Sequence, residues 1–182
     1  MGTLNLSSGV SLSATGTAFG NSAASWSDAP PGTIIQTVWG GLTASNDTNL
    51  ITMTSSSATE VDTNLRVTIT PKKSNSVMLV SWSGTSRSNT SSNGSIVPYV
   101  STDGGSNWNN NFVYYTGTSF QEMIRNDNAS TMWHSFSLDF IDNVTTGTTQ
   151  RIYSLFSVVS AGTLYIGDHG LSVRMIVQEI AQ

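Results

Sequence analysis

The sequence predicts an all-β protein, an antiparallel β-sandwich or jelly roll of about 8–10 short strands preceded by an extended N-terminal arm. Short apolar segments that alternate with period 2 or are rich in β-branched residues recur along residues 32–182. Clusters of Gly, Pro, Asn and Ser separate these segments, and only residues 121–130 have the composition of a helical turn. No segment recurs at a fixed period, so neither a propeller nor a solenoid is expected.

The N-terminal residues 1–31 differ in composition from the rest of the chain. They are mostly small and polar, and the first large apolar residues among them are Leu4, Leu6, Val10 and Leu12. A segment with so little apolar surface does not fold by itself, so we expect an arm that becomes ordered against a partner. The alternative is a tail without stable structure. Pro30 and Pro31 impose extended backbone, which divides the chain into an anchoring arm at 1–31 and a β-sandwich knob domain at 32–182.

The first half of the knob domain is expected to form strands at residues 33–39, 50–53, 64–70, 77–83 and 96–101. The first of these is β-branched and aromatic, and the third alternates in polarity until Pro71 ends it. The fourth is the most apolar, so we expect it at the centre of a sheet. Pro98 places the fifth toward a sheet edge, and the polar residues 87–95 are expected to form a loop.

The second half is expected to form strands at residues 111–117, 132–142, 151–160, 162–167 and 171–180. The second of these strands alternates in polarity, with one face made by Met132, His134, Phe136, Leu138 and Phe140. The last strand alternates in the same way, with one face made by Leu171, Val173, Met175 and Val177. Such alternation is typical of antiparallel strands that bury one face.

The composition excludes several classes of function. Charged residues make up only 10% of the chain, and the net charge is −4. The seven Lys and Arg residues form no run, so we expect neither a nucleic-acid partner nor binding to an anionic membrane. No apolar run approaches the length of about 18 residues that a membrane-spanning helix needs. The chain has no cysteine, which excludes disulfides and thiolate metal sites and suits synthesis in a reducing cytoplasm.

The octapeptide STDGGSNW at residues 101–108 has the spacing of an Asp-box, a short hairpin best known from sialidases and other propeller glycosidases. In such a turn the Asp103 carboxylate accepts hydrogen bonds from backbone N–H groups, Gly105 takes a positive φ, and Trp108 packs beneath the hairpin. The motif builds a turn and performs no catalysis, and here it occurs once. We therefore expect Ser101, Asp103, Gly105 and Trp108 to form a structural Asp-box-like turn between strands at 96–101 and 111–116.

Aromatic and asparagine side chains beside this turn are the candidate receptor- or glycan-binding residues. They are Trp108, Asn109, Tyr114 and Tyr115, which lie in or next to the segment NWNNN. Exposed rings with neighbouring amide groups suit stacking against sugars and hydrogen bonding to their hydroxyls. The alternative is ordinary packing of the rings beneath the hairpin.

No group of residues indicates catalysis or a bound metal or cofactor. A metal site needs three or four ligands, and His134 and His169 are the only histidines. Because His134 falls on the apolar face of its strand, we expect it to be a hydrogen-bonded core residue. Asp139 and Asp142 are candidates for a glycosidase carboxylate pair, but we expect Asp139 on the solvent face of its strand and Asp142 at the start of a turn. The chain is therefore expected to be no enzyme and to hold no cofactor and no metal.

Four segments give the chain a resemblance to a known family: PGTIIQTVW, DTNLRVTITPKKSNSVMLVSWSG, YVSTDGGSNW and LSVRMIVQEIAQ. Their order resembles the β-sandwich, jelly-roll-like C-terminal domain of tail fibres and virion appendages of tailed phages, especially marine and cyanobacterial phages. The resemblance covers residues 31–182 and implies a homotrimer, a location on the virion and no shared catalytic residues. A long fibre would carry a shaft of repeats before this domain, whereas here only residues 1–31 precede it.

The resemblance and the residues together predict a trimeric virion surface appendage, a short tail fibre or spike tip, made in the host cytoplasm and displayed on the particle. We expect residues 1–31 to contact other virion proteins and the knob to mediate attachment to the host surface, with host polysaccharide as the candidate receptor. One alternative is a capsid decoration, cement or head-fibre protein. A second alternative is a glycan-active enzyme or a free lectin.

Overall fold

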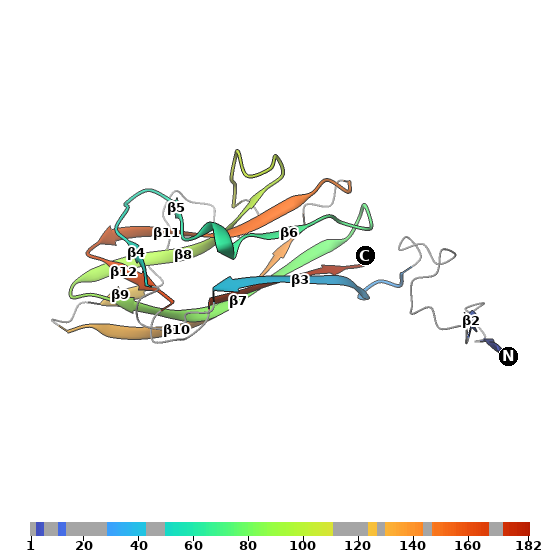
Figure 1. The fold of residues 1–182 in the computed structure, drawn as a ribbon, viewed down its shortest axis with the longest axis horizontal. Coiled ribbons are helices and arrows are strands. Elements are labelled where there is room, and N and C mark those ends of the chain that lie inside the picture. Colours follow the sequence, from blue (N-terminus) through green and yellow to red (C-terminus); the bar gives the residue numbers. More distant parts are fainter. Residues whose placement is uncertain are drawn as a thin grey trace.

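The computed structural model describes residues 3–5, 11–13, 29–42, 50–110, 124–126, 130–143, 147–167 and 173–182. Within these residues the chain forms β-strands and a single 3-10 turn, and no α-helix. The knob domain consists of two antiparallel sheets packed face to face (Figure 1). In the predicted arm, β1 (Thr3–Asn5) and β2 (Ser11–Ser13) pair with each other in antiparallel orientation.

The first sheet is built around β7 (Val77–Ser88). One edge of β7 pairs along almost its whole length with β10 (Met132–Asp142). The other edge pairs first with β13 (Val173–Ile180) and then with β12 (Leu164–Ile166). The sheet is extended by β3 (Ile34–Leu42) beyond β13 and by β4 (Ile51–Met53) beyond β12. The central position expected for residues 77–83 is therefore confirmed.

The second sheet is built around β11 (Arg151–Ala161). One edge of β11 pairs with β8 (Ser92–Ser101), whose far edge carries β9 (Ile124–Asn126) only over Ser92–Gly94. The other edge pairs with β5 (Thr59–Glu60) and β6 (Val67–Ile69). Beyond Gly94 the outer edge of β8 pairs with no described strand except for a single bridge from Val100 to Asn109, which is compatible with Pro98 in this strand.

The strand order is that of a jelly roll. The first sheet has the order β3–β13–β7–β10, and the second has the order β5/β6–β11–β8–β9. Strands that follow each other in the chain, such as β7 and β8 or β10 and β11, therefore lie in opposite sheets, as in the eight-stranded double-sheet jelly roll. This confirms the predicted fold class, an antiparallel β-sandwich of the jelly-roll type.

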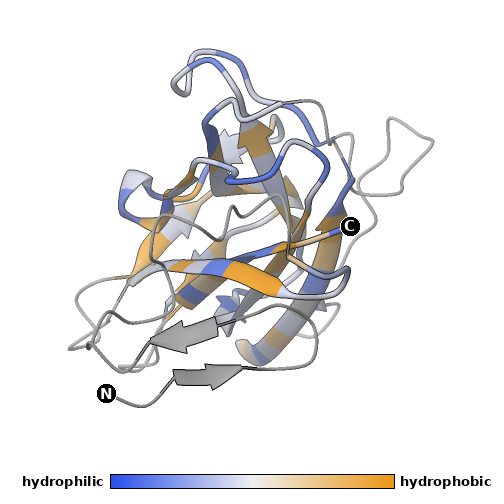
Figure 2. Cartoon of the chain, turned by 90° about the vertical axis from the view of Figure 1, so that its right-hand side faces the viewer, coloured by the Kyte–Doolittle hydropathy of each residue, from blue (hydrophilic) through white to orange (hydrophobic). Residues whose placement is uncertain are grey.

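The core lies between the two sheets and draws on the inward side chains of both. Its fully buried members include Leu65, Val80, Trp82, Ile96, Leu155, Leu164, Met175 and Val177. The Trp82 ring meets Phe136 edge-on at 5.9 Å and Phe140 at 5.7 Å, an arrangement that aromatic pairs favour. Figure 2 shows hydrophobic residues concentrated on the strands and hydrophilic residues in the connecting turns.

A buried carboxylate on the last strand, β13, links this strand to β3 and to the connection between β6 and β7. Glu179 on β13 has no exposed surface and accepts hydrogen bonds from the backbone N–H groups of Lys72 (2.8 Å) and Lys73 (3.0 Å). It also accepts from the hydroxyl of Ser76 and the amide of Gln36, both at 2.6 Å. Burial alone would raise the pKa of Glu179, but these hydrogen bonds outweigh it and lower the pKa below its ordinary value.

Three local predictions were wrong. Residues 64–65 belong to a 3-10 turn, η2 (Thr63–Leu65), because the Asp62 side chain accepts a hydrogen bond from the Asn64 N–H at 2.7 Å. The expected loop at 87–95 is instead a tight connection at 89–91, since β7 and β8 extend into this polar segment. Part of the expected helical turn at 121–130 is strand β9, whose buried Asn126 amide donates to the Asn89 and Ser130 carbonyls. The strand expected at 111–117 lies outside the described residues.

Candidate functional site

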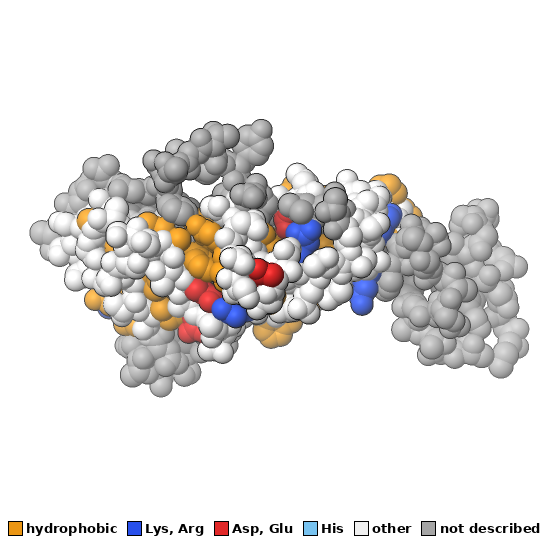
Figure 3. All heavy atoms as spheres, turned by 90° about the horizontal axis from the view of Figure 1, so that it is seen from above, with side chains coloured by type: hydrophobic (Ala, Val, Ile, Leu, Met, Phe, Trp, Pro, Cys, Tyr) orange, Lys and Arg blue, Asp and Glu red, His pale blue; other side chains and the backbone are white. Residues whose placement is uncertain are grey.

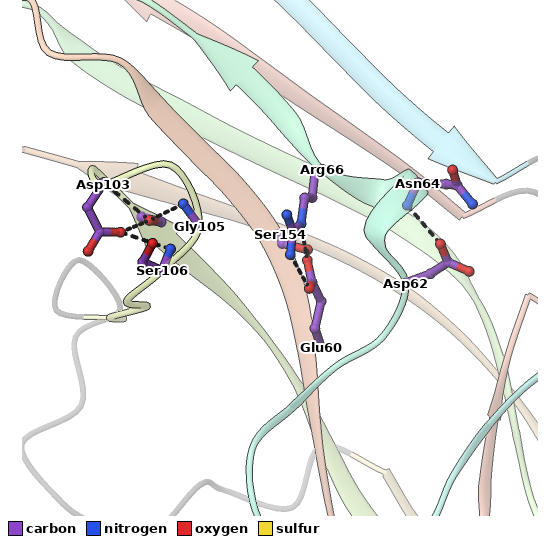
Figure 4. A network of polar contacts seen from close by, with 9 residues as sticks. Glu60, Asp62, Asn64, Arg66, Asp103, Gly105, Ser106 and Ser154 are labelled. Carbon is purple, nitrogen blue, oxygen red and sulfur yellow. Dashed lines mark hydrogen bonds and ion pairs between the residues drawn. The ribbon is translucent and has the colours of Figure 1, made fainter.

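The turn at residues 101–108 has the hydrogen bonds expected of an Asp-box. Asp103 Oδ1 accepts from the backbone N–H groups of Ser106 (3.1 Å) and Asn107 (2.9 Å), and from the Ser101 hydroxyl at 2.7 Å. The Ser101 hydroxyl in turn accepts from the Gly105 N–H at 2.9 Å (Figure 4). These bonds, first among them that from the Asn107 backbone, hold the pKa of Asp103 well below its usual range. The carboxylate is therefore committed to organising the turn.

Two glycines complete the turn for different reasons. Gly104 and Gly105 have φ angles of +76° and +90°, which side chains with a Cβ disfavour. A Cβ on Gly104 would lie in open space, whereas a Cβ on Gly105 would lie 3.2 Å from Nη1 of Arg66. Gly105 thus provides both the backbone conformation and the space in which the Arg66 guanidinium sits.

Arg66 ties this turn to the second sheet, a contact that the sequence did not indicate. Its Nε and Nη2 donate to the two carboxylate oxygens of Glu60, each at 2.7 Å, and Ser154 on β11 donates to the same carboxylate at 2.6 Å. The hydrogen bond from Arg66 is the main reason why the pKa of Glu60 is lowered. The guanidinium also lies over the Trp108 ring, 5.2 Å from its centroid.

Trp108 is packed rather than freely presented. Its half-buried ring lies 5.2 Å from Phe156, and Phe156 in turn lies 4.3 Å from Tyr99, so three rings cover the outer surface of β8 and β11. Asn109 is exposed, and its backbone exchanges hydrogen bonds of 2.8 and 2.9 Å with Val100. The Trp108 ring thus packs on the second sheet and also stays partly exposed. Tyr114 and Tyr115 lie outside the described residues.

The remaining candidate residues do not converge on one site. His134 is half-buried on β10, accepts or donates one hydrogen bond with the Ser88 hydroxyl at 3.0 Å, and has its pKa lowered by burial, as a core histidine would. Asp139 is exposed on the outer face of β10. His169 lies outside the described residues. Among the residues that are described, no group of three or more His, Cys, Asp or Glu side chains is placed to hold a metal ion.

Asp142 is the last residue of β10 and is buried, which the sequence did not indicate; residues 144–146, which would show the expected turn, lie outside the described residues. Its Oδ2 accepts from Arg151 Nη1 at 3.0 Å and from the Tyr153 hydroxyl at 2.6 Å. All three side chains are almost fully buried. Burial and the neighbouring Asp142 carboxylate raise the pKa of Tyr153, so the hydroxyl stays a donor. This group stabilises the end of the sandwich and has the geometry of a paired buried charge.

A second surface was missed entirely, namely the outer face of the first sheet. Successive side chains of a strand point to opposite faces, so residues that lie between buried neighbours point away from the core. We define the outer apolar face as the large apolar residues at these outward positions: Ile34, Trp39, Val77, Leu79, Ile141, Ile176 and Ile180. Exposure is 72% for Trp39, 54% for Ile141 and 52% for Ile34, and the other four residues are half-buried.

Cross-strand pairing places members of the outer apolar face next to one another, with Ser81 and Gln178 between the groups. Ile180 lies opposite Ile34 on one side and Val77 on the other. In the same way, Ile176 lies opposite Trp39, and Leu79 lies opposite Ile141. Beyond these rows, at the far end of the same sheet, the Arg87 guanidinium is sandwiched between Tyr165 at 4.4 Å and Trp133 at 5.5 Å. Figure 3, seen from the side of the second sheet, shows hydrophobic patches among backbone and uncharged polar groups, with a few charged side chains.

No protein-family model matches the chain, and no curated protein sequence matches it significantly. No helix in the described part of the chain is long and apolar enough to cross a membrane. The fold and the surfaces themselves are therefore the basis for the function proposed below.

Proposed function

We propose that this protein is a structural protein of a bacteriophage virion, a trimeric surface appendage that contributes to attachment to the host. Residues 32–182 form the displayed knob, and residues 1–31 contact other virion proteins. The observation that carries the proposal is the jelly-roll strand order of the knob domain, an architecture that recurs in viral capsid and lectin domains. The sequence resemblance to phage appendage domains points to the same class of protein.

The proposed arrangement also fits the ends of the knob domain. Pro30–Thr33 leads into β3 beside the last residues of the chain, where the Gly32 N–H donates to the Ala181 carbonyl at 2.8 Å and the Ala181 N–H donates to the Thr33 carbonyl at 2.9 Å. Lys73 adds hydrogen bonds to the carbonyls of Ala29 (3.3 Å) and Gln182 (2.9 Å). The arm thus leaves the knob from one firmly bonded end, which suits a domain attached to a particle at that end.

Binding to host polysaccharide is the receptor chemistry that we propose for the knob, with Trp108 and Asn109 as described candidate contacts. Asn109 is exposed and Trp108 is partly exposed beside it. Weak contacts of this kind gain strength when several copies are displayed together. A polysaccharide array probed with the purified protein, and with Asn109→Ala and Trp108→Phe variants, would measure this contribution.

The location is tested by labelling purified particles of the encoding phage with antibodies against the knob, viewed by electron microscopy. Label at the tail supports the attachment role. Label confined to heads favours a decoration or head-fibre protein instead. Particles without any label contradict the virion proposal altogether.

The arm is tested by deleting residues 1–28, which keeps Ala29 and the bonded end of the knob. We expect the shortened protein to remain folded, with the cooperative thermal unfolding of the full chain, and to be missing from assembled particles. Normal incorporation of the shortened protein would refute the anchoring role.

A further inference from the structure

Three large apolar side chains of the outer apolar face are more than half exposed to water. Its most exposed members, Trp39, Ile141 and Ile34, lie on β3 and β10, and the half-buried members lie on β13 and β7 between these two strands. Exposed apolar patches of this kind mark interaction sites on otherwise polar proteins. A sheet face with exposed apolar side chains can be buried against another element with an apolar face.

Two opposite charges lie on the same face, one on each side of β7. Arg174 on β13 is opposite Ser83, and Asp139 on β10 is opposite Ser81. Both side chains are exposed, and among the described residues neither forms an ion pair within the chain. Because adjacent strands are about 4.8 Å apart, the backbones at these two positions are about 10 Å or more apart.

We propose that the outer apolar face is the contact between copies of this chain, and that Arg174 of one copy pairs there with Asp139 of another. This inference names the surface through which the copies of the proposed trimeric appendage contact each other. It rests on the proposed function only for the number of copies. The apolar side chains supply the buried surface, and the charge pair fixes the orientation of the two faces.

The chemistry of the face fits a second copy better than another partner. A surface that carries one cation, one anion and apolar side chains is complementary to itself. An anionic glycan or nucleic acid would leave Asp139 repelled, and polysaccharide hydroxyls would not match Ile34 and Ile141. In a closed ring, the β3–β13 side of one copy, with Trp39 and Arg174, meets the β10 side of the next, with Asp139 and Ile141.

Charge reversal tests the pairing directly, with light scattering across a size-exclusion peak as the readout. We expect Arg174→Glu and Asp139→Arg each to weaken association by about tenfold or more, because like charges then face each other. The double variant, which exchanges the two charges, should recover association. Thr68→Glu is the matched control, because it adds a negative charge at an exposed position on the opposite sheet.

A cross-linking experiment gives a second readout that does not depend on affinity. The chain has no cysteine, so Arg174→Cys combined with Asp139→Cys introduces the only thiols. Disulfides need Cα atoms within about 7 Å, so these two positions cannot bridge within one chain. Under mild oxidation we expect covalent dimers and higher species on a non-reducing gel, and each single-cysteine variant should give much less product.

The outcomes separate this inference from the proposed function. A trimer that both single charge reversals leave intact, with no cross-link, overturns the assigned face while the appendage proposal stands. A dimer that is broken by the single reversals and restored by the double variant supports the face but contradicts the trimer. A parent protein that remains monomeric at the highest concentration tested overturns the inference. Circular dichroism of every variant confirms that the fold is retained, as expected for exposed positions.

Discussion

Replacing Glu179 tests whether the buried carboxylate holds the sandwich together at its chain end. Its two oxygens accept two backbone N–H groups from the β6–β7 connection as well as the side chains of Ser76 and Gln36. Ser76 and Gln36 each have a second acceptor, the carbonyls of Lys73 and Thr70 respectively. The backbone donors of Lys72 and Lys73 therefore lose most when the carboxylate is removed.

The magnitude follows from these donors. A buried donor left without an acceptor costs about 1–3 kcal/mol, and the N–H groups of Lys72 and Lys73 are only part-buried, so Glu179→Ala should lower the free energy of unfolding by about 2–4 kcal/mol. Glu179→Gln keeps one acceptor oxygen but presents an amide donor to the Gln36 amide, and should cost about 1–3 kcal/mol. Either loss is a large fraction of the stability of about 5–15 kcal/mol that a typical domain has.

The pH dependence provides a second signature. The pKa of Glu179 is lowered in the folded protein from an ordinary value of 4.5. Its contribution to stability is therefore complete above the unfolded-state pKa and is lost as the pH falls through the folded-state pKa. Glu60 contributes in the same direction, because its pKa is lowered too. Glu179→Gln should thus flatten the acid limb of stability against pH without abolishing it.

Urea unfolding followed by circular dichroism, at one protein concentration and several pH values, measures both effects. A fixed concentration matters because association between copies also adds to apparent stability. The reasoning is refuted if Glu179→Ala changes the unfolding free energy at pH 7 by less than about 0.5 kcal/mol, the range of an ordinary surface substitution. An unchanged acid limb in Glu179→Gln would separately refute the lowered pKa.

The other stability predictions concern the Asp-box-like turn and the buried ion pair. Gly105→Ala should lower the thermal midpoint more than Gly104→Ala, because both residues have positive φ but only Gly105 would also press a Cβ against Arg66; equal losses in a thermal scan would remove the role assigned to Arg66. Asp142→Asn should destabilise the domain by about 3–5 kcal/mol, since it leaves the Arg151 guanidinium buried without its carboxylate. Tyr153→Phe, which removes only one hydrogen bond to the same carboxylate, should cost about 1 kcal/mol, and urea unfolding that ranked these two variants the other way would contradict the ion-pair account.

Local sequence patterns predicted the strands well where one face is apolar and the other polar. Residues 135–140 alternate between polar and apolar side chains, and β10 contains this segment. The sequence pattern did not predict the parts of strands whose side chains are small and polar, because pairing with neighbouring strands stabilises those parts. Ser88, Ser92 and Ser95 are small and polar, yet they are buried in β7 and β8 because neighbouring strands satisfy their backbone groups.

The candidate site was predicted only as far as its interactions are local. The turn at residues 101–108 depends on hydrogen bonds between residues at most four apart, so the turn could be predicted from the spacing of those residues in the sequence. Arg66 reaches the turn from the junction between η2 and β6, and Asp142 finds its partners on β11, so both depend on tertiary contacts. The outer apolar face likewise requires the register of neighbouring strands, which no single segment specifies.

The two sheets differ in how far an outward-pointing aromatic residue is covered. On the second sheet, Phe156 points away from the core but is only 7% exposed, because the Asp-box-like turn lays Trp108 over it. On the first sheet, Trp39 also points away from the core, yet it remains 72% exposed. Burying 72% of a tryptophan that can bury up to about 250 Å² removes about 180 Å² from water, which is about 4.5 kcal/mol at about 25 cal/mol per Å². On the second sheet the Asp-box-like turn provides this kind of burial for Phe156, whereas on the first sheet the isolated chain leaves Trp39 exposed. The free energy that burial of Trp39 would contribute is the physical reason to expect a second copy on the outer apolar face.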